Sequence, residues 1–290
     1  MLLGPESLDN TEALVNLDVE ILIDSVERLH SVQAAAARTR KRPSVHLAID
    51  SGMGRFGADM ESAHGIANML SSDGDIHWAG VMTHFAAADS DAAFSMEQWE
   101  RFESETDAWA RDGITVPTRH AANSAAILRL PQTHADMVRP GLMLYGMQPS
   151  PNDPEPQLQP VLSWTTNIAA LHRHSPGDTI GYGRTHTVHT DSLIATLPVG
   201  YGDGVPWSRN NAGWVLVKGV KVPVVGRVSM DQTTVDVTGI QGVELSDEVA
   251  LIGRQGTEYI TTEQWAEWSG TINYEITTRL ASRVHREYVG

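Results

Sequence analysis

The chain has 290 residues, of which 41% are hydrophobic and 20% charged, a composition typical of a soluble globular protein. Its formal net charge of −15 argues against nucleic acid as a partner, because phosphate binding needs clustered lysine and arginine. Cysteine is absent, which excludes a disulfide scaffold, a thiol nucleophile and a cysteine-ligated metal, and fits a cytoplasmic protein. The apolar runs are too short to cross a bilayer and the N-terminus does not resemble a signal peptide, so we expect no membrane association.

Short apolar runs alternate with amphipathic helical patterns up to about residue 156. The runs predict strands at residues 2–3, 19–23, 45–49, 78–82, 118–122 and 137–138. Helical spacing predicts helices over residues 25–37, 60–70 and 96–109. In the last of these an apolar and aromatic stripe, which we interpret as core packing, consists of Met96, Trp99, Phe102, Thr106 and Trp109. This alternation is typical of a parallel sheet covered by helices.

The number of strands bears on the fold. A (β/α)8 TIM-type barrel needs eight strand–helix units in roughly 250 residues, and the pattern provides about six. An open doubly wound sheet could stop at that number, whereas a barrel would be left with two unpaired edges. From the pattern alone both architectures stay open.

A second domain is predicted to follow Pro151, Pro154 and Pro156, which mark a boundary. Beyond them, β-type runs occur at residues 193–198, 214–217, 222–225, 233–237 and 249–252, and Lys218-Gly219 predicts a hairpin turn. Helical patterns return only at residues 262–268 and 274–280. We therefore predict an α/β domain over residues 1–156 and a mostly β domain over residues 157–290.

Short strings along the whole chain resemble those of alanine racemases. In the first domain they are D-S-G-M-G-R-F-G at residues 50–57, T-H-F-A at 83–86, H-A-A-N-S at 120–124, V-R-P-G at 138–141 and L-Y-G at 144–146. In the second they are G-Y-G-R-T at 181–185, G-Y-G-D-G at 200–204 and G-R-V-S-M-D-Q at 226–232. The resemblance implies an incomplete TIM-type barrel, with about six of the eight units, followed by a β domain. It also implies interconversion of L- and D-alanine, which supplies peptidoglycan precursors.

Racemisation removes a proton from an amino-acid Cα and returns it on the other face, so it needs an electron sink and two acid/base groups. The resemblance implies that pyridoxal phosphate is the sink, held as a Schiff base on a lysine, and that Tyr182 is one base. A phenol with a pKa of about 10 is a poor base at neutral pH, so Tyr182 needs nearby positive charge or donors. We expect His84 and Arg139, at the carboxyl ends of strands, to provide them. In the family this tyrosine reaches into the other subunit's site, which implies a homodimer with shared active sites.

The resemblance also assigns cofactor-binding residues. Arg139 matches the arginine that faces the pyridine nitrogen; because a guanidinium does not readily give up its proton, that nitrogen would stay unprotonated. Ser124, Gly141 and Leu142 match phosphate-binding positions, where a hydroxyl and backbone N–H groups hold an anion. Tyr274 matches the family's phosphate-binding tyrosine near the C-terminus.

Arg55 and the Met230 backbone match positions that hold the substrate carboxylate, for which a bidentate arginine is well suited. Tyr201 matches a residue that lines the entrance, which would favour small substrates. Ala48 departs from the pattern, because the family often has a carbamylated lysine there that steadies the arginine. We expect a bound anion or another side chain to orient Arg55 instead.

The largest departure concerns the cofactor lysine. The family carries it near the N-terminus, on the first barrel strand, whereas the lysines of this chain are Lys41, Lys218 and Lys221. We expect the first two barrel strands and the lysine to be missing together and the true start to lie upstream of Met1. The chain alone would then be poorly soluble, form no Schiff base and be inactive unless the missing segment is present.

Other functions stay open. A racemase of broader specificity is compatible with the same strings, and a degenerate, non-catalytic racemase remnant would explain the absent lysine. A pyridoxal-phosphate decarboxylase is disfavoured, because those enzymes use a cysteine in a site string. A metal hydrolase would rest on the pairs His172/His174 and His186/His189, which no carboxylate motif accompanies.

Overall fold

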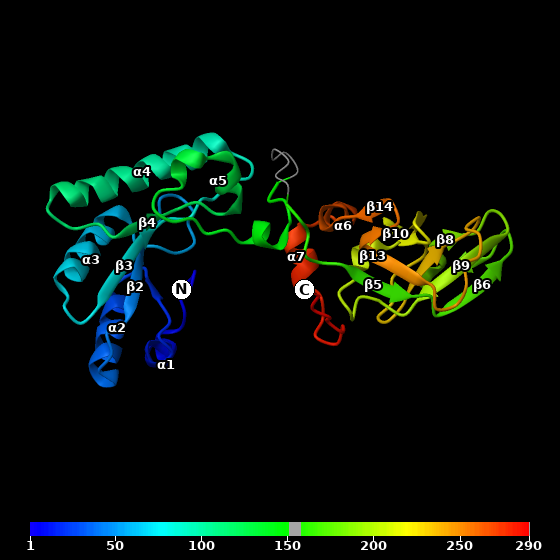
Figure 1. The fold of residues 1–290 in the computed structure, drawn as a ribbon, viewed down its shortest axis with the longest axis horizontal. Coiled ribbons are helices and arrows are strands. Elements are labelled where there is room, and N and C mark those ends of the chain that lie inside the picture. Colours follow the sequence, from blue (N-terminus) through cyan, green and yellow to red (C-terminus); the bar gives the residue numbers. More distant parts are fainter. Residues whose placement is uncertain (151–157, 290) are drawn as a thin grey trace. The chain divides into compact units, whose positions relative to one another are not determined.

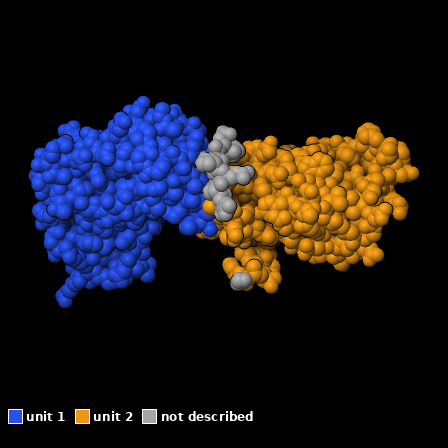
Figure 2. Space-filling model, turned by 45° about the horizontal axis from the view of Figure 1, so that its top comes forward, with its two compact units in different colours: residues 1–144, 149–157 blue, residues 145–148, 158–290 orange. Residues whose placement is uncertain are grey.

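A computed structural model describes residues 1–150 and 158–289, which form two compact units (Figures 1 and 2). Unit 1 is built on residues 1–144, and unit 2 on residues 158–289 together with residues 145–148. The prolines at 151, 154 and 156, which we interpreted as the domain boundary, lie outside the described residues.

Unit 1 is a parallel sheet in the strand order β1-β2-β3-β4 (Figure 1). Its strands are β1 (Ile21–Ile23), β2 (Ser44–Ala48), β3 (His77–Met82) and β4 (Thr118–His120). Its helices are α1 (Thr11–Asn16), α2 (Val26–Thr39), α3 (Met60–Ser72), α4 (Ala92–Arg111) and α5 (Ser124–Arg129). Ser25, Asp59 and Asp91 cap α2, α3 and α4, each accepting a bond from a first-turn backbone N–H. The predicted α/β alternation is therefore confirmed.

The two faces of this sheet bury different residues. Alternate strand residues, such as Ile21, Val45 and Val81, pack into a large core with the helices. Leu22, Ala48 and Met82 point to the opposite face, where they form a small cluster against Phe56. This second face is the one that carries the candidate site.

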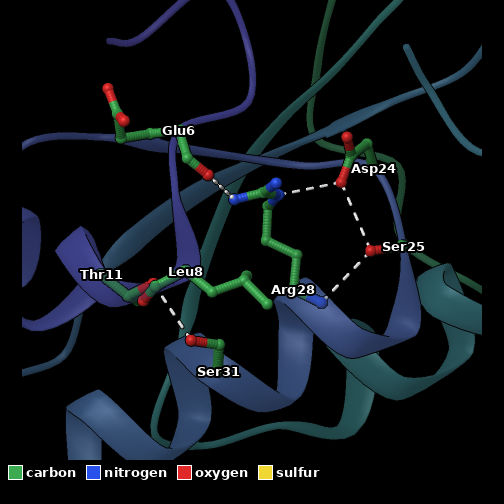
Figure 3. Close-up of polar contacts among 7 residues, drawn as sticks. All are labelled: Glu6, Leu8, Thr11, Asp24, Ser25, Arg28 and Ser31. Atoms are coloured by element: carbon green, nitrogen blue, oxygen red, sulfur yellow. Dashed lines mark hydrogen bonds and ion pairs between the residues drawn. The ribbon is translucent and has the colours of Figure 1, made fainter.

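The strand expected at residues 2–3 does not form. The Leu2 N–H donates one hydrogen bond to the Glu20 carbonyl (3.0 Å), but Pro5, which has no N–H, follows soon after. The segment is instead held by Arg28, which donates to the Glu6 carbonyl (2.6 Å) and to Asp24 Oδ1 (2.9 Å) (Figure 3). One ladder bond is too little to make a strand.

The strand expected at residues 137–138 is reduced to a single parallel bridge between Met137 and His120. Ahead of it the Asp136 carboxylate, rather than a backbone carbonyl, accepts from the Arg119 N–H (2.7 Å). Beyond it Pro140 again lacks a donor. The described residues of unit 1 therefore contain four strands where the sequence pattern predicted about six.

Unit 2 is mostly β, as predicted. One sheet has the order β11-β10-β13-β14 with β5 also paired to β13, a second has the order β12-β9-β6, and β7 and β8 form a hairpin. The strands are β5 (Trp164–Asn167), β6 (Ala170–His174), β7 (Thr179–Ile180), β8 (His186–Thr187), β9 (Ser192–Leu197), β10 (Trp214–Val217), β11 (Val220–Pro223), β12 (Thr233–Asp236), β13 (Glu248–Gln255) and β14 (Glu258–Ile260). The helices are α6 (Thr262–Ser269) and α7 (Asn273–Thr278). The core gathers valines of both sheets around Trp164 and Trp265.

The predicted turn at Lys218-Gly219 is confirmed. Both residues have positive φ (49° and 76°), and the turn joins β10 to β11 with Val217 opposite Val220. Because β11 starts immediately after the turn, the strand predicted at 222–225 is shifted toward the N-terminus. No helix in the described part of the chain is long and apolar enough to cross a membrane.

Candidate functional site

The loops that follow β2, β3 and β4 meet at the carboxyl edge of the unit 1 sheet, where active sites of barrel folds gather. His120 is the last residue of β4, and His84 lies two residues beyond β3. Arg139 follows the Met137 bridge and extends the pairing by donating its backbone N–H to the Ala122 carbonyl (2.9 Å). The structure therefore brings together the two predicted residues of this edge, His84 and Arg139.

The Arg139 guanidinium is held by neutral acceptors. The two hydrogens of its Nη2 are shared among three acceptors, the carbonyls of Thr83 and Ala121 (both 2.9 Å) and His84 Nδ1 (3.2 Å). Its Nη1 donates to His120 Nδ1 (2.7 Å). Burial lowers the pKa of Arg139 to about 10, so it stays charged at neutral pH. Within the described chain no carboxylate forms a salt bridge with it, and its Nε–H has no acceptor. The group is a fixed cation with a donor left for a ligand.

Both histidines bound to Arg139 are neutral. An arginine can only donate, so Nδ1 of His84 and of His120 must carry a lone pair, and each ring then carries its proton on Nε2. Burial, followed by the charges of Arg139 and Arg55, lowers the pKa of His84 to about 4. Burial and Arg139 lower the pKa of His120 to about 3. His84 therefore offers an Nε2–H donor near pH 7 rather than a positive charge.

Ser124 and Gly141 lie in contact. The buried Ser124 Oγ accepts from the Gly141 N–H (2.9 Å) and from the Met143 N–H (3.4 Å). Asn123, not Ser124, caps α5, since its Oδ1 accepts from the Ala126 N–H. The hydroxyl hydrogen of Ser124 and the N–H of Leu142 have no acceptor among the described residues. Together they offer two donors to an anionic oxygen.

Arg55 stands on a loop that Asp50 organises. The Asp50 carboxylate accepts from the N–H groups of Gly52, Met53 and Gly54 at 2.8–3.1 Å. The exposed Arg55 guanidinium lies over the Phe56 ring, with its Cζ 4.8 Å from the ring centroid. This cation–π contact connects Arg55 to the apolar cluster that contains Ala48.

A buried glutamine supports the His84 turn. Gln98 of α4 accepts from the Ala86 N–H (2.9 Å) and donates to the His84 carbonyl (3.2 Å). Its side chain is fully buried. The sequence gives no signal for the role of Gln98, because Gln98 lies beside an aromatic stripe that accounts for the burial of that helix.

Unit 2 contains an open concavity of about 1060 Å³ lined by three of the predicted residues, Tyr182, Tyr201 and Met230. Tyr182 is 72% exposed, and its neighbours Gly181 and Gly183 both have positive φ (70° and 72°), which explains the need for glycine there. A Cβ on Gly183 would lie 3.0 Å from Cζ of Arg227. Arg227, which was not among the predicted site residues, also lines the concavity.

Tyr201 and Met230 are adjacent through their backbones. The N–H groups of Tyr201 and Gly202 donate to the carbonyls of Ser229 (3.0 Å) and Met230 (2.8 Å). Arg283, near the C-terminus, joins the same two loops by donating to Asp203 Oδ1 (2.7 Å) and Asp231 Oδ1 (2.6 Å). Arg283 was not predicted, because none of the strings that resemble the family includes it.

Two predicted features remain outside these clusters. Tyr274 lies on α7 of unit 2, while Ser124 belongs to unit 1, so their shared phosphate role stays a prediction. The three lysines are paired with carboxylates, Lys41 with Asp18, Lys218 with Asp247 and Lys221 with Glu258, and none contacts Arg139. Within residues 1–150 and 158–289, no three histidine, aspartate or glutamate side chains are grouped so as to hold a metal ion.

Comparisons with known proteins cover nearly the whole chain. The family model "Alanine racemase, N-terminal domain" matches residues 1–149, and "Alanine racemase, C-terminal domain" matches residues 161–288. An alanine racemase of Halothermothrix orenii is 43% identical over 96% of this chain and 74% of that protein. One from Desulforamulus reducens is 39% identical over 100% of this chain and 79% of that protein.

Solved structures agree. Alanine racemase from a Streptomyces lavendulae that produces D-cycloserine superposes with a TM-score of 0.92 at 32% identity, over 100% of this chain and 77% of that one. The Bacillus anthracis enzyme gives a TM-score of 0.87 at 36% identity, over 98% of this chain and 74% of that one. These similarities confirm the predicted barrel-type domain followed by a β domain. The chain belongs to the alanine racemase family.

Proposed function

We propose that this chain interconverts L- and D-alanine. The family is pyridoxal-phosphate dependent, which makes the chain a racemase, an isomerase, with that cofactor. The observation that carries the proposal is Arg139, a buried cation without a carboxylate partner in the described chain, fixed by Thr83, Ala121, His84 and His120. When bound, pyridoxal phosphate supplies the electron sink that makes the substrate Cα–H acidic.

The residues present fit the ring and the phosphate of that cofactor. Arg139 would donate to the ring nitrogen, and because a guanidinium keeps its proton, the nitrogen would remain an acceptor. Charge would then stay closer to Cα, which favours return of the proton over other reactions. The hydroxyl of Ser124 and the N–H of Leu142 would bind phosphate oxygens. Gly141 places its N–H on Ser124 Oγ and so orients that hydroxyl, and Tyr274 would complete the phosphate contacts.

Tyr182 would exchange the proton at one face of Cα, with the Nε2–H of His84 stabilising the phenolate. Arg55 would pair with the substrate carboxylate, together with the backbone N–H of Met230. Tyr201 would narrow the entrance and favour a small substrate such as alanine.

We further propose a cytoplasmic homodimer in which the Tyr182 of one copy serves the Arg139 of the other, producing D-alanine for peptidoglycan precursors. The support is the face around the concavity, where the large side chains of Tyr182, Tyr201, Trp207 and Met230 are all exposed. A cluster of this kind is typical of an interaction surface.

The activity is tested by incubating the purified chain with pyridoxal phosphate and L-alanine and measuring D-alanine by chiral chromatography. Because Lys41, Lys218 and Lys221 are each paired with a carboxylate, each reaction is run with and without methylamine as a source of primary amine. Since we expect the chain to lack the lysine that forms the Schiff base, we expect no racemisation without methylamine. With methylamine we expect cofactor-dependent racemisation, which Tyr182→Phe and Arg139→Gln abolish. The matched control is Tyr288→Phe, which alters a tyrosine that is 90% exposed at the C-terminus. Racemisation that persists unchanged in Tyr182→Phe would refute the assignment.

The shared site is tested separately by mixing the two inactive variants. If Tyr182 and Arg139 of one site come from different copies, about half of the dimers are mixed and half of their sites are intact, so about a quarter of wild-type activity returns. No recovery after subunit exchange, or a monomer in analytical ultracentrifugation, would contradict the dimer proposal.

A further inference from the structure

A line of polar side chains crosses the unit 1 sheet behind Arg139. His120 Nε2 lies 2.8 Å from His46 Nδ1, and His46 Nε2 lies 3.3 Å from Glu20 Oε2. His120 is 0% exposed and His46 4% exposed, whereas the Glu20 side chain is 44% exposed. The line therefore runs from the buried end of Arg139 to a carboxylate at the β1 edge.

Arg139 fixes the position of every hydrogen in this line. It must donate to His120 Nδ1, so the neutral His120 carries its proton on Nε2 and donates to His46 Nδ1. His46, which accepts at Nδ1, carries its own proton on Nε2 and donates to Glu20. All bonds point the same way, from the guanidinium toward the carboxylate, and such aligned bonds polarise one another.

The sheet is built to allow this contact. His46 is on β2 and His120 on β4, so β3 lies between them. Opposite His46 stands Gly80, where a Cβ would lie 2.3 Å from His46 Nδ1. The β2–β3 register also shifts at this point, with Val45 opposite Trp78 and His46 opposite Gly80. A glycine and an irregularity in the middle of a buried strand are unfavourable in themselves, and here they make room for the two rings.

We propose that Glu20, His46 and His120 are positioning residues that hold Arg139 as a donor toward the cofactor ring. Position 80 is a glycine because any Cβ there would keep the rings of His46 and His120 apart. This inference rests on the proposed function of Arg139. Without an acceptor at position 46, His120 would have a fully buried, unpaired Nε2–H. It could avoid this by moving the proton to Nδ1, where it would face Arg139 and remove an acceptor from the guanidinium.

The test compares His46→Asn with His46→Leu. These side chains have nearly the same shape, but only asparagine places an acceptor oxygen where Nδ1 was. Gly80→Ala is a second way to separate the two rings. His77→Leu is the control, because the His77 side chain on β3 is exposed and, among the described residues, bonds only to the Ser44 hydroxyl. Ring ¹⁵N resonances of the full chain report each tautomer, and fluorescence titration with pyridoxine 5′-phosphate reports ring binding without a Schiff base.

In the wild type we expect both histidines as Nε2–H tautomers, and any other tautomer overturns the proposal. His46→Leu and Gly80→Ala should give a mixed His120 tautomer and about tenfold weaker pyridoxine 5′-phosphate binding, with His46→Asn and His77→Leu close to wild type. An unchanged His120 and unchanged affinity in His46→Leu would overturn it as well. If the wild type fails to bind pyridoxine 5′-phosphate, the proposed function fails, while the tautomers still decide the proposal on the histidine line.

Discussion

Acid should destabilise unit 1 through His84 and His120. Their folded pKa values, about 4 and about 3, lie below the ordinary value of 6.5, so the unfolded chain binds protons first as the pH falls. The stability that both groups contribute is complete above pH 6.5 and is lost as the pH falls toward 4 and 3. At about 1.4 kcal/mol per pKa unit, the upper limits are roughly 3 kcal/mol for His84 and roughly 5 kcal/mol for His120.

Urea unfolding at a series of pH values, followed by the ring ¹⁵N resonances of these two histidines, measures the effect in unit 1 alone. In Arg139→Met both pKa values should rise, because Arg139 is the second largest cause of each shift, but stay below 6.5, because burial is the largest. The variant should therefore be less stable than wild type at pH 7, because the four acceptors of Arg139 lose their donor. Its free energy of unfolding should also depend less on pH between 6.5 and 4. A wild-type His84 that titrates near 6.5 would show that the geometry around Arg139 is not as described.

Three further substitutions probe the support around the site. Gln98→Leu leaves the backbone groups of the His84 turn that Gln98 binds unpaired, so urea unfolding should show a loss of about 2 kcal/mol in the free energy of unfolding. Gln98→Glu should retain part of the wild-type stability, and equal stability of Gln98→Leu and wild type would contradict this. Arg283→Ala frees the two loops of the concavity and should raise the KM for alanine about threefold with little change in kcat. Arg283→Lys should raise the KM less, and a change in kcat alone would argue against a role of Arg283 in positioning these loops. Phe56→Leu removes the ring under Arg55 and should raise the same KM about threefold, while Phe56→Tyr keeps it; strong chloride dependence in the wild type would instead favour an anion as the partner of Arg55.

Local patterns predicted the elements that local chemistry determines. Helix α2 begins at its cap, Ser25, and the β10–β11 hairpin turns at Lys218-Gly219, because both signals act within a few residues. The strands β5 and β6 were missed, since their sequences W-T-T-N and A-L-H-R-H lack the apolar alternation that identifies a strand. The opposite error occurred at residues 2–3 and 137–138, where the pairing stops after one backbone contact, from Leu2 to Glu20 and from Met137 to His120.

The sequence predicted those site residues whose position follows from the order of the parallel strands. Arg139, His84 and Ser124 follow parallel strands, whose carboxyl ends share one edge, so motifs far apart in sequence had to converge. Gln98 and Arg283 act through contacts 12 or more residues away, at His84, Ala86, Asp203 and Asp231, and no spacing rule reveals such partners.

His46 and Gly80 show what sequence reasoning leaves out. Each alone looks like a flaw in a buried strand: a histidine among apolar residues and a glycine that packs nothing. Only the β2–β3 register puts the missing Cβ opposite the imidazole, and only β4 supplies the second ring that the gap admits. Since each residue is unfavourable without the other, a single substitution that restores the local strand preference, such as Gly80→Ala, should harm the site rather than improve the sheet. Two residues that are each unfavourable in a strand, but that fit together in the folded sheet, are therefore better evidence for a buried functional contact than either residue by itself.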